Sequence, residues 1–413
     1  FGQHWTKITR GVPSSPLSFA RNVTEDPARQ GLLYLGTENR LYFSTDDGGH
    51  WQSLMTDLPP APMYWLTVQP HFHDLVVGTY GRGIWILDDV TPLEQLTPEV
   101  AAKPAHLFAP REAWRFHAAV APNAMFDDPS AGENPPYGAS INYWLKSVPD
   151  GVDSVRVLVT DASGDTVRSL SGPAEAGINR VWWDLQTEPT DVIKRRVTPE
   201  NATWMDVGKK GWFAMPWGRQ FSILSPPGAY TVTMEVGGER FSQPLTVKKD
   251  PHSEGSLDDI DAQVRMLRSL YADMNRVAAM TNRIEWMRRQ LADLRPVLEG
   301  ADAADLLASG DSLEASLRHV EAKLVQLKLT GTGQDDVRWP VRLAGRVSYL
   351  AGEVASNDFP PTDQARAVQE ILEQSIDQVS RELDAAVTQS LQPFNQELAR
   401  RGLGGIVGEL PQG

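Results

Sequence analysis

The 413-residue sequence contains no cysteine. The protein therefore has no disulfide bridges, thiolate nucleophiles or cysteine-ligated zinc. No apolar run approaches the roughly 18 residues that a membrane helix needs, so direct membrane insertion is not expected. Basic residues are outnumbered, with 39 Lys and Arg against 53 Asp and Glu and a formal net charge of −14. Because nucleic acids and anionic membranes attract basic surfaces, this balance disfavours both as partners.

Aromatic residues become scarce in the second half of the chain. Eleven of the 13 tryptophans lie between Trp5 and Trp217, and only Trp286 and Trp339 follow. Before about residue 250, short apolar runs are set between Gly and Pro residues, which is typical of strands. After about residue 255, the apolar spacing becomes that of a helix. The sequence therefore predicts a multidomain β + α protein with strands before helices.

A repeat near the start predicts propeller blades. Gly48-Gly49-His50-Trp51 echoes Gly2-Gln3-His4-Trp5, and Leu35-Gly36-Thr37 matches Val77-Gly78-Thr79. Units of about 40 to 50 residues with several short strands are typical of β-propellers, which close with about four to eight blades. Residues 1–97 have room for about two terminal blades. We therefore expect further blades upstream, in the same or a separate chain.

The clearest motif is Ser-x-Asp-x-Gly-x-x-Trp, formed by Ser44, Asp46, Gly48 and Trp51. In a hairpin, Asp46 would accept backbone N–H bonds, Gly48 would take a positive φ angle, and Trp51 would pack between sheets. These roles need no substrate, so we interpret Asp46 and Asp47 as turn-forming residues rather than catalytic carboxylates. The motif resembles the Asp-box of BNR-repeat propellers, sialidases and sortilin-like proteins.

Two further segments extend the resemblance. The run from His71 to Asp89, continued by Pro92–Leu96, is similar to the closing blade of large exported bacterial BNR-repeat proteins of the sortilin-like, glycosyl hydrolase-related kind. The segment Trp339–Leu350 resembles the C-terminal region of the same proteins. The resemblance implies a partial β-propeller made of last blades. It also implies export to the periplasm, the cell surface or the medium.

Two features of this run have alternative interpretations. His71 and His73, two apart on a strand, would face the same way and suit a metal ion. The sequence places no third ligand, so a turn is favoured and neither a metal nor a cofactor is expected. Arg82, between two glycines, would bind an anionic ligand at the propeller mouth or reach nearby loop carbonyls. The carbonyl alternative is favoured, because the resemblance to sialidases would require three arginines.

Residues 98–142 are predicted to be a linker and residues 143–250 a β-sandwich. Apolar and polar residues alternate in 155–159 and 231–236, so each strand would have one buried and one solvated face. The segments 177–185 and 226–230 resemble Ig-like or fibronectin-III-like modules of secreted bacterial proteins. Such a resemblance implies a spacer or a binding support.

Within this sandwich, residues 190–220 are predicted to be an insertion. Trp204, Trp212 and Trp217 are interleaved with six Lys and Arg against three Asp and Glu. The insertion would form a platform for a carbohydrate or anionic ligand, or it would bury its tryptophans against the propeller. Packing is favoured because large aromatic side chains in a loop need a dry environment.

Residues 256–405 predict an antiparallel helical bundle, followed by a tail at 406–413. Ser256 is a suitable N-cap, and apolar residues recur at steps of three and four until a helix end near Pro296. Methionines at helical spacing are interpreted as core residues rather than a partner groove. Further helical patterns cover residues 313–329, 341–354 and about 362–400, the last with a kink at Pro393.

The leading functional hypothesis is a non-catalytic recognition or assembly part of an exported propeller protein, binding a protein, peptide or glycan. The first alternative is a glycoside hydrolase, sialidase-like or otherwise exo-acting, with its catalytic residues mostly in upstream blades. Such an enzyme needs two carboxylates about 5 to 9.5 Å apart, one of them with a raised pKa. Candidates in or near loops are Asp88, Asp89, Asp127, Asp128 and Glu133. The second alternative is a structural subunit of a larger complex.

Overall fold

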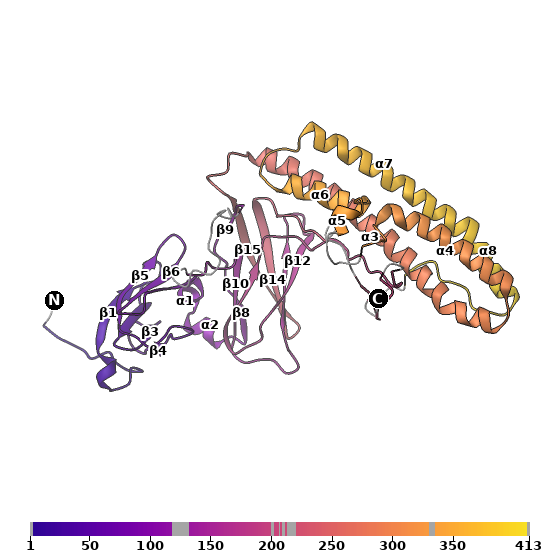
Figure 1. The fold of residues 1–413 in the computed structure, drawn as a ribbon. Coiled ribbons are helices and arrows are strands. Elements are labelled where there is room, and N and C mark those ends of the chain that lie inside the picture. The colour runs from indigo at the N-terminus through magenta and orange to yellow at the C-terminus, as the bar shows by residue number, and fades with distance from the viewer. Residues whose placement is uncertain are drawn as a thin grey trace. The chain divides into compact units, whose positions relative to one another are not determined.

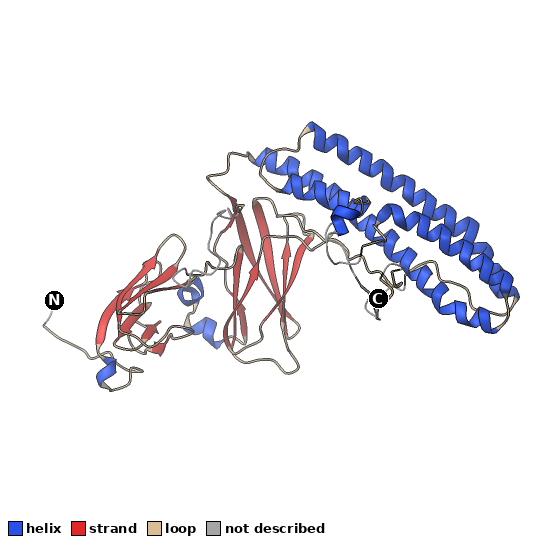
Figure 2. Cartoon of the chain, in the orientation of Figure 1, coloured by secondary structure: helices blue, strands red, loops and turns tan. Residues whose placement is uncertain are grey.

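The computed structural model describes residues 3–117, 132–199, 202–205, 207–208, 211–212, 220–329 and 335–410. The chain forms two compact units, one of Phe1–Gln186 with Pro227–Asp250 and one of Thr187–Pro226 with Pro251–Gly413. Figures 1 and 2 show mostly strands in the first unit and long helices in the second. The expected combination of several β-sheets with a C-terminal helical region is confirmed.

The first unit begins with two small antiparallel sheets, in the strand orders β1-β2-β3-β4 and β5-β6-β7. A short 3-10 helix, η1 (Pro16–Ser18), precedes them, and two short helices follow, α1 (Thr91–Gln95) and α2 (Pro98–Ala102). The strands are β1 (Ala20–Glu25), β2 (Leu33–Thr37), β3 (Leu41–Ser44), β4 (Gln52–Ser53), β5 (Met63–Gln69), β6 (Asp74–Thr79) and β7 (Ile84–Leu87). One apolar core, which includes Tyr34, Phe43, Leu66 and Val77, joins the two sheets.

Two larger sheets complete the first unit, in the orders β13-β10-β8 and β12-β11-β14-β15-β9. All their strand pairs are antiparallel except β15 with β9. Their strands are β8 (Ala105–Leu107), β9 (Ala113–Arg115), β10 (Ala139–Leu145), β11 (Val155–Thr160), β12 (Thr166–Gly172), β13 (Gly177–Trp183), β14 (Gly228–Val236) and β15 (Glu239–Lys249). The strands expected at 155–159 and 231–236 are confirmed. A turn at Gly237 and Gly238, both with positive φ, connects β14 to β15.

A buried hydrogen-bond network links the small sheets to the larger ones. Asp89 is buried, and its carboxylate accepts hydrogen bonds from Thr91, Ser140 and Asn142. Arg180 donates to the Asn142 side chain at 2.7 Å and to the backbone carbonyl of Asp89 at 2.7 Å. Because a buried carboxylate needs such donors, this network fixes the chain where it leaves β7.

The second unit is a set of packed helices. Ser256 is the N-cap of the first helix, as the sequence predicts, and it forms a capping box with Asp259. The expected helix end near Pro296 is wrong, because this helix continues to Gly300. Proline removes one donor near the C-terminal end, and the last turn still forms. A π-helical turn, η2 (Val387–Leu391), interrupts the last helical segment just before Pro393. The helices are α3 (Leu257–Gly300), α4 (Ala304–Leu324), α5 (Asp335–Arg338), α6 (Leu343–Ala355), α7 (Asp363–Ala386) and α8 (Gln392–Arg400).

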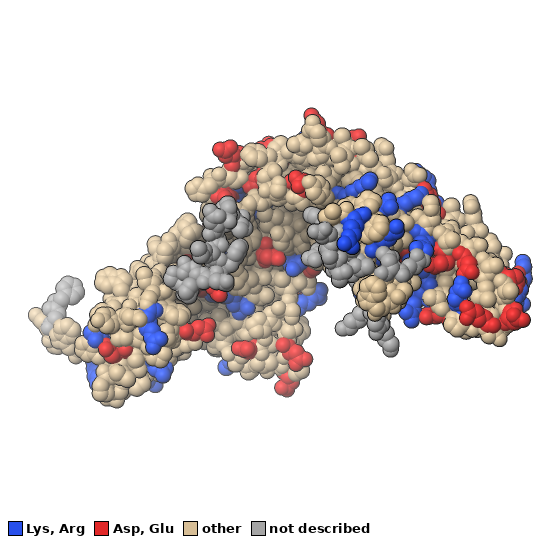
Figure 3. Space-filling view, viewed as in Figure 1, with Lys and Arg blue, Asp and Glu red and all other residues tan. Residues whose placement is uncertain are grey.

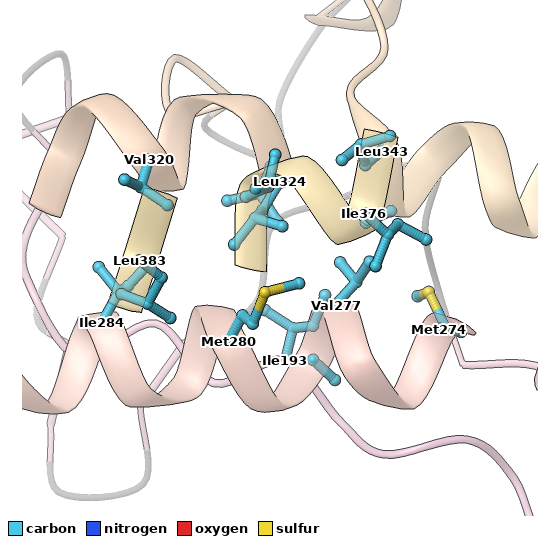
Figure 4. Packing of buried hydrophobic residues seen from close by; sticks show 14 of the residues in the cluster. Ile193, Met274, Val277, Met280, Ile284, Val320, Leu324, Leu343, Ile376 and Leu383 are labelled. Carbon is cyan, nitrogen blue, oxygen red and sulfur yellow. The ribbon is translucent and has the colours of Figure 1, made fainter. Parts of the chain in front are cut away.

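The helical core includes residues from the segment before the helices, among them Ile193 and Ile223. Figure 4 shows Ile193 among side chains of α3, α4, α6 and α7. Met274 and Met280 lie in the same buried cluster, so the interpretation of these methionines as core residues is confirmed. On the face drawn in Figure 3, basic and acidic side chains are interspersed over the helices. No helix in the described part of the chain has the length and hydropathy needed to cross a membrane.

Candidate functional site

The sheet β5-β6-β7 has one covered face and one open face. Leu66 and Val77 are opposite one another and lie in the shared core with the first sheet. The opposite face carries Trp65, Ile84 and Ile86, which are 67%, 74% and 58% exposed. These three residues define what we call the open face. Three large apolar side chains on one side of a small sheet are typical of a binding surface.

The open face of the second sheet has an equivalent face in the first sheet. Gly36 pairs with Leu41 in the first sheet, and Gly78 pairs with Ile84 in the second. By this register, Leu41 corresponds to Ile84, and Phe43 corresponds to Ile86. Leu41 and Phe43 are buried in the core shared with the second sheet. The same face is therefore covered in the first sheet and uncovered in the second.

The two glycines differ in the same way. A Cβ atom on Gly36 would lie 2.6 Å from the carbonyl oxygen of Met63, the first residue of β5. The absence of a side chain at Gly36 thus allows the next sheet to approach closely. A Cβ atom on Gly78 would meet only Trp65, its own strand neighbour, at 3.4 Å or more. In addition, β7 is an edge strand, bonded to β6 alone in its sheet.

A pocket of about 330 Å³ lies in the first unit, at the turn between β5 and β6 and near β9. Its volume is within the range of small-ligand sites. The polar groups of the pocket include a dyad, in which His73 Nδ1 and Glu94 Oε1 are 2.7 Å apart. Six of the residues that line it are His71, Phe72, His73, Glu94, Arg111 and Trp114.

Burial and hydrogen bonding act in opposite directions on the Glu94 carboxyl. Burial raises the pKa of Glu94 above its ordinary value, and the hydrogen bond with His73 lowers it in part. Among the described residues, the carboxylate of Glu94 has this one hydrogen-bond partner. The other carboxylate oxygen of Glu94 thus has no hydrogen-bond partner in the described part of the chain.

The cations around the pocket are already engaged. Arg111 donates to the backbone carbonyl of Phe72 and to Asp74, the latter at 3.2 Å. Lys248 forms an ion pair with Glu112 and lies 5.5 Å from the ring centroid of Trp114. Within the described residues, no group of three His, Asp or Glu side chains is arranged to hold a metal ion. The pair His71 and His73 thus lines a pocket with aromatic and acidic neighbours.

The turn from Ser44 to Trp51 is held by its own side chains. The carboxylate of Asp46 accepts hydrogen bonds from Ser44 Oγ at 2.7 Å and from the backbone N–H of His50 at 2.8 Å. These bonds lower the pKa of Asp46, with the Ser44 hydroxyl as the largest cause. Gly48 has a φ of 82°, and Trp51 is buried with its indole N–H donating to Ile8. The geometry assigns Asp46 to the turn.

Arg82 lies at the tip of the β6–β7 hairpin. The flanking Gly81 and Gly83 both have positive φ angles, which turn the chain at this point. The Arg82 side chain is exposed and makes no hydrogen bond or ion pair with a described residue. Its backbone carbonyl accepts a hydrogen bond from the Trp85 indole at 2.9 Å. Among the described residues, the Arg82 guanidinium thus has no anionic partner.

The five candidate carboxylates are not gathered in one place by the described structure. The carboxylate of Asp89 is engaged by the hydrogen bonds of its buried network. Asp88 is half-buried, and burial raises its pKa, followed by the charge of Asp74. Glu133 is exposed. Asp127 and Asp128 lie outside the described residues. Sequence reasoning missed Glu94, whose only signal was its position in the resembling segment 92–96.

The three tryptophans of the 190–220 segment have different surroundings. Trp204 is 77% exposed, whereas Trp212 is 9% exposed and lies 4.7 Å below the guanidinium of Arg195. The indole N–H of Trp212 donates to the carbonyl of Val197. Trp217 lies outside the described residues. Trp212 thus packs within the helical unit, and Trp204 faces solvent.

Side chains of helix α3 bind the backbone of the 187–197 segment. The Asn282 side chain accepts from the N–H of Lys194 at 2.7 Å and donates to the carbonyl of Val192 at 2.9 Å. Asn275 accepts from the N–H of Asp191 in the same manner, at 2.8 Å. Tyr271, whose hydroxyl donates to the carbonyl of Pro189 at 3.1 Å, is spaced to lie on the same side of the helix as Asn275 and Asn282. This ladder, together with Ile193, explains why the segment belongs to the helical unit.

A buried charge cluster ends this ladder. Glu285 accepts from the backbone N–H of Arg196 at 2.5 Å, and Arg195 Nε is 3.4 Å from its other oxygen. Arg288 lies 2.5 Å from Glu321. Burial raises the pKa of Glu321 to about 8, with the negative charge of Glu285 as the next cause. The two carboxyl groups thus share the charge of the two arginines, and burial favours the protonated form of Glu321.

Comparisons with known proteins identify no family. No protein-family description matches the chain, and no curated protein matches it. The chain is similar to an alpha-2-macroglobulin variant from Salmonella, with 13% identity and a TM-score of 0.19, over 55% of this chain and 12% of that chain. It is also similar to the extracellular domain of a hybrid two-component system from B. thetaiotaomicron, with 12% identity and a TM-score of 0.14, over 56% of this chain and 25% of that domain. Such TM-scores carry no argument about function.

Proposed function

We propose that this chain is a non-catalytic recognition or assembly part of an exported BNR-repeat propeller protein. In this proposal, β1–β4 and β5–β7 are propeller blades, and the larger sheets form an Ig-like support. The observation that supports it is the open face, formed by Trp65, Ile84 and Ile86. An apolar face of this kind needs a cover in water.

The proposed occupant is a further antiparallel β-sheet, from the same or a separate polypeptide. The equivalent face of the first sheet is covered by such a sheet, whose Met63 backbone approaches Gly36 closely. The second sheet also has a glycine at this position, Gly78, and the apolar residues beside it pair in the same register as those beside Gly36. A partner strand passing over Gly78 would reproduce the contact that this chain makes internally. The edge of β7 extends the surface available to it.

Site-specific photo-crosslinking tests this proposal in the cells that make the protein. A photoreactive residue in place of Ile84 is expected to form adducts with strand segments of a partner sheet. Ile371 on α7, which is 61% exposed, provides the matched control position. The additional change Gly78→Val should reduce the adducts, because its side chain blocks close approach. Equal labelling from Ile84 and Ile371 would contradict the proposal.

A glycoside hydrolase is the second candidate. It is favoured by Glu94, a carboxyl with a raised pKa in a pocket, as a general acid requires. A panel of chromogenic glycosides tests it directly. Turnover that Glu94→Gln abolishes would replace the recognition proposal with an enzymatic one. A structural subunit, the third candidate, would form the Ile84 crosslinks without binding any ligand of its own.

A further inference from the structure

The first small sheet has an exposed face on the side away from the second sheet. Thr24 donates a hydrogen bond to the backbone carbonyl of Leu66 at 3.0 Å, so it points toward the second sheet. Its strand neighbour Val23 points the opposite way, because successive residues of a strand alternate between faces. Val23 is 56% exposed and pairs with Leu35, which is buried in a separate small cluster. We call the surface of Val23 and Leu35 the Val23 face.

The register of the two sheets makes Val23 the equivalent of Leu66. Leu35 and Val77 each precede the equivalent glycine, and they pair with Val23 and Leu66 respectively. Both strand pairs also have a register shift near the start of their first strand. Leu66 is 2% exposed and lies in the core between the sheets. The Val23 face is thus the exposed counterpart of a face that is buried in the second sheet.

The open face and the Val23 face are complementary, because the chain already packs one kind of face on the other. The face of the first sheet with Leu41 and Phe43 shares a core with the face of the second sheet that carries Leu66. The open face is equivalent to the former, and the Val23 face is equivalent to the latter. The open face of one copy would therefore accept the Val23 face of a second copy, in the arrangement present within the chain.

The polar contact of the internal packing also has a counterpart. Thr67 is the equivalent of Thr24, since each follows directly after Leu66 or Val23. Thr67 is exposed, and its hydroxyl has no hydrogen-bond partner among the described residues. Between two copies it would donate to the backbone carbonyl of Val23, as Thr24 does to that of Leu66.

The Val23 face also carries a charged residue. Glu25 is the next residue of β1 on this face, and its carboxylate accepts a hydrogen bond from the backbone N–H of Gly31 at 2.9 Å. The carboxylate therefore keeps a donor when a second copy covers the face.

We propose that copies of this chain bind head to tail, with the Val23 face of one copy packed on the open face of the next. The inference rests on the proposed function, of which it names the partner of the open face. Because the two faces differ, each pair of copies leaves one face of each kind free, and the contact can repeat. With two small sheets in each copy, a ring of about four to eight blades corresponds to about two to four copies.

Size-exclusion chromatography with light scattering, applied to the whole chain over a range of concentrations, tests this inference. The unchanged chain is expected to form species of two or more copies. Val23→Asp and Ile84→Asp each place a charge in the apolar contact and should weaken association at least about a hundredfold. Ile371→Asp, at an exposed position of α7, is the matched control and should associate as the unchanged chain does.

A mixture of the two variants distinguishes head-to-tail binding from other arrangements. Val23→Asp keeps its open face and Ile84→Asp keeps its Val23 face, so an equal mixture should form a dimer and nothing larger. Pairing of two identical faces would give no such recovery. Recovery also shows that both variants are folded, and circular dichroism of each variant alone checks this independently. Thr67→Val, which removes one hydroxyl donor, should weaken association about fivefold.

Three results would overturn the inference. They are an unchanged chain that stays monomeric at every concentration, a mixture of folded variants that stays monomeric, and association that Thr67→Val and Ile84→Asp leave unaltered. If Ile84 nevertheless crosslinks to another polypeptide in cells, this inference fails and the proposed function stands. Absence of both self-association and Ile84 crosslinks would contradict both.

Discussion

At the residue scale, Gly36 and Gly78 are equivalent positions with different surroundings. Gly36→Ala places a Cβ 2.6 Å from the Met63 carbonyl oxygen, so β2 or β5 must shift. We expect it to lower the free energy of unfolding of the first unit by about 1–3 kcal/mol. Gly78→Ala meets only Trp65 and should change this free energy by less than about 0.5 kcal/mol. Urea unfolding followed by tryptophan fluorescence measures both, and equal losses would contradict the difference in packing between Gly36 and Gly78.

The buried carboxyl of Glu321 predicts a pH dependence. Its folded-state pKa of about 8 lies above its ordinary value of 4.5. Between these values the folded state binds one more proton than the unfolded state, so the free energy of unfolding of the helical unit falls as pH rises. The slope is at most about 1.4 kcal/mol per pH unit. It ends above about pH 8, where both states have lost the proton.

Glu321→Gln tests this dependence. The amide keeps the shape of a protonated carboxyl and does not titrate, so its stability should be flat where that of the unchanged protein falls. Circular dichroism of the helices during urea unfolding at pH 5, 7 and 9 gives the comparison. Glu285 and Arg288 on α3, Arg195 on the bound segment and Glu314 on α4 remain in both proteins. Parallel pH curves for the two proteins would show that Glu321 is already ionised.

At the element scale, the α3 ladder decides where the 187–197 segment lies. Asn282→Ala removes two hydrogen bonds to the segment backbone and leaves a carbonyl and an N–H to find water. We expect a loss of about 1–3 kcal/mol and faster amide hydrogen exchange at Lys194. Arg268→Ala, at an exposed position of the same helix, should change neither. Unaltered exchange at Lys194 in the Asn282 variant would contradict the prediction and would assign the segment's position to its other contacts, such as Ile193 and Asn275.

Sequence patterns identify the elements better than their partners. The alternation in 155–159 and the Ser256 cap predict a strand and a helix start, because both signals are local. The expectation that the helix ends near Pro296 is wrong, since the loss of one N–H donor near a helix end is tolerated. The sequence does not indicate that the 190–220 segment binds α3, because Asn275 and Asn282 resemble many other polar residues on helices. Their role in binding the segment depends on residues about 90 positions earlier in the chain.

At the scale of the whole molecule, the two units have separate cores. We therefore predict two unfolding transitions in scanning calorimetry rather than one. Gly36→Ala should lower the temperature of the transition of the β unit alone, and Asn282→Ala that of the helical unit alone. If either variant shifts both transitions together, the two units unfold cooperatively and this division is wrong.

The sequence by itself determined the order of strands before helices, the hairpin turns and the helix cap, because each follows from spacing or from residues within a few positions of one another. Only the tertiary structure decided which faces are covered. Ile84 and Leu41 are similar in type and register, but a neighbouring sheet buries one and leaves the other exposed. Likewise, the pocket brings His73 to Glu94 and Trp114 through folding of separate elements. Burial depends on contacts distant in sequence, and these contacts give otherwise ordinary residues their chemistry.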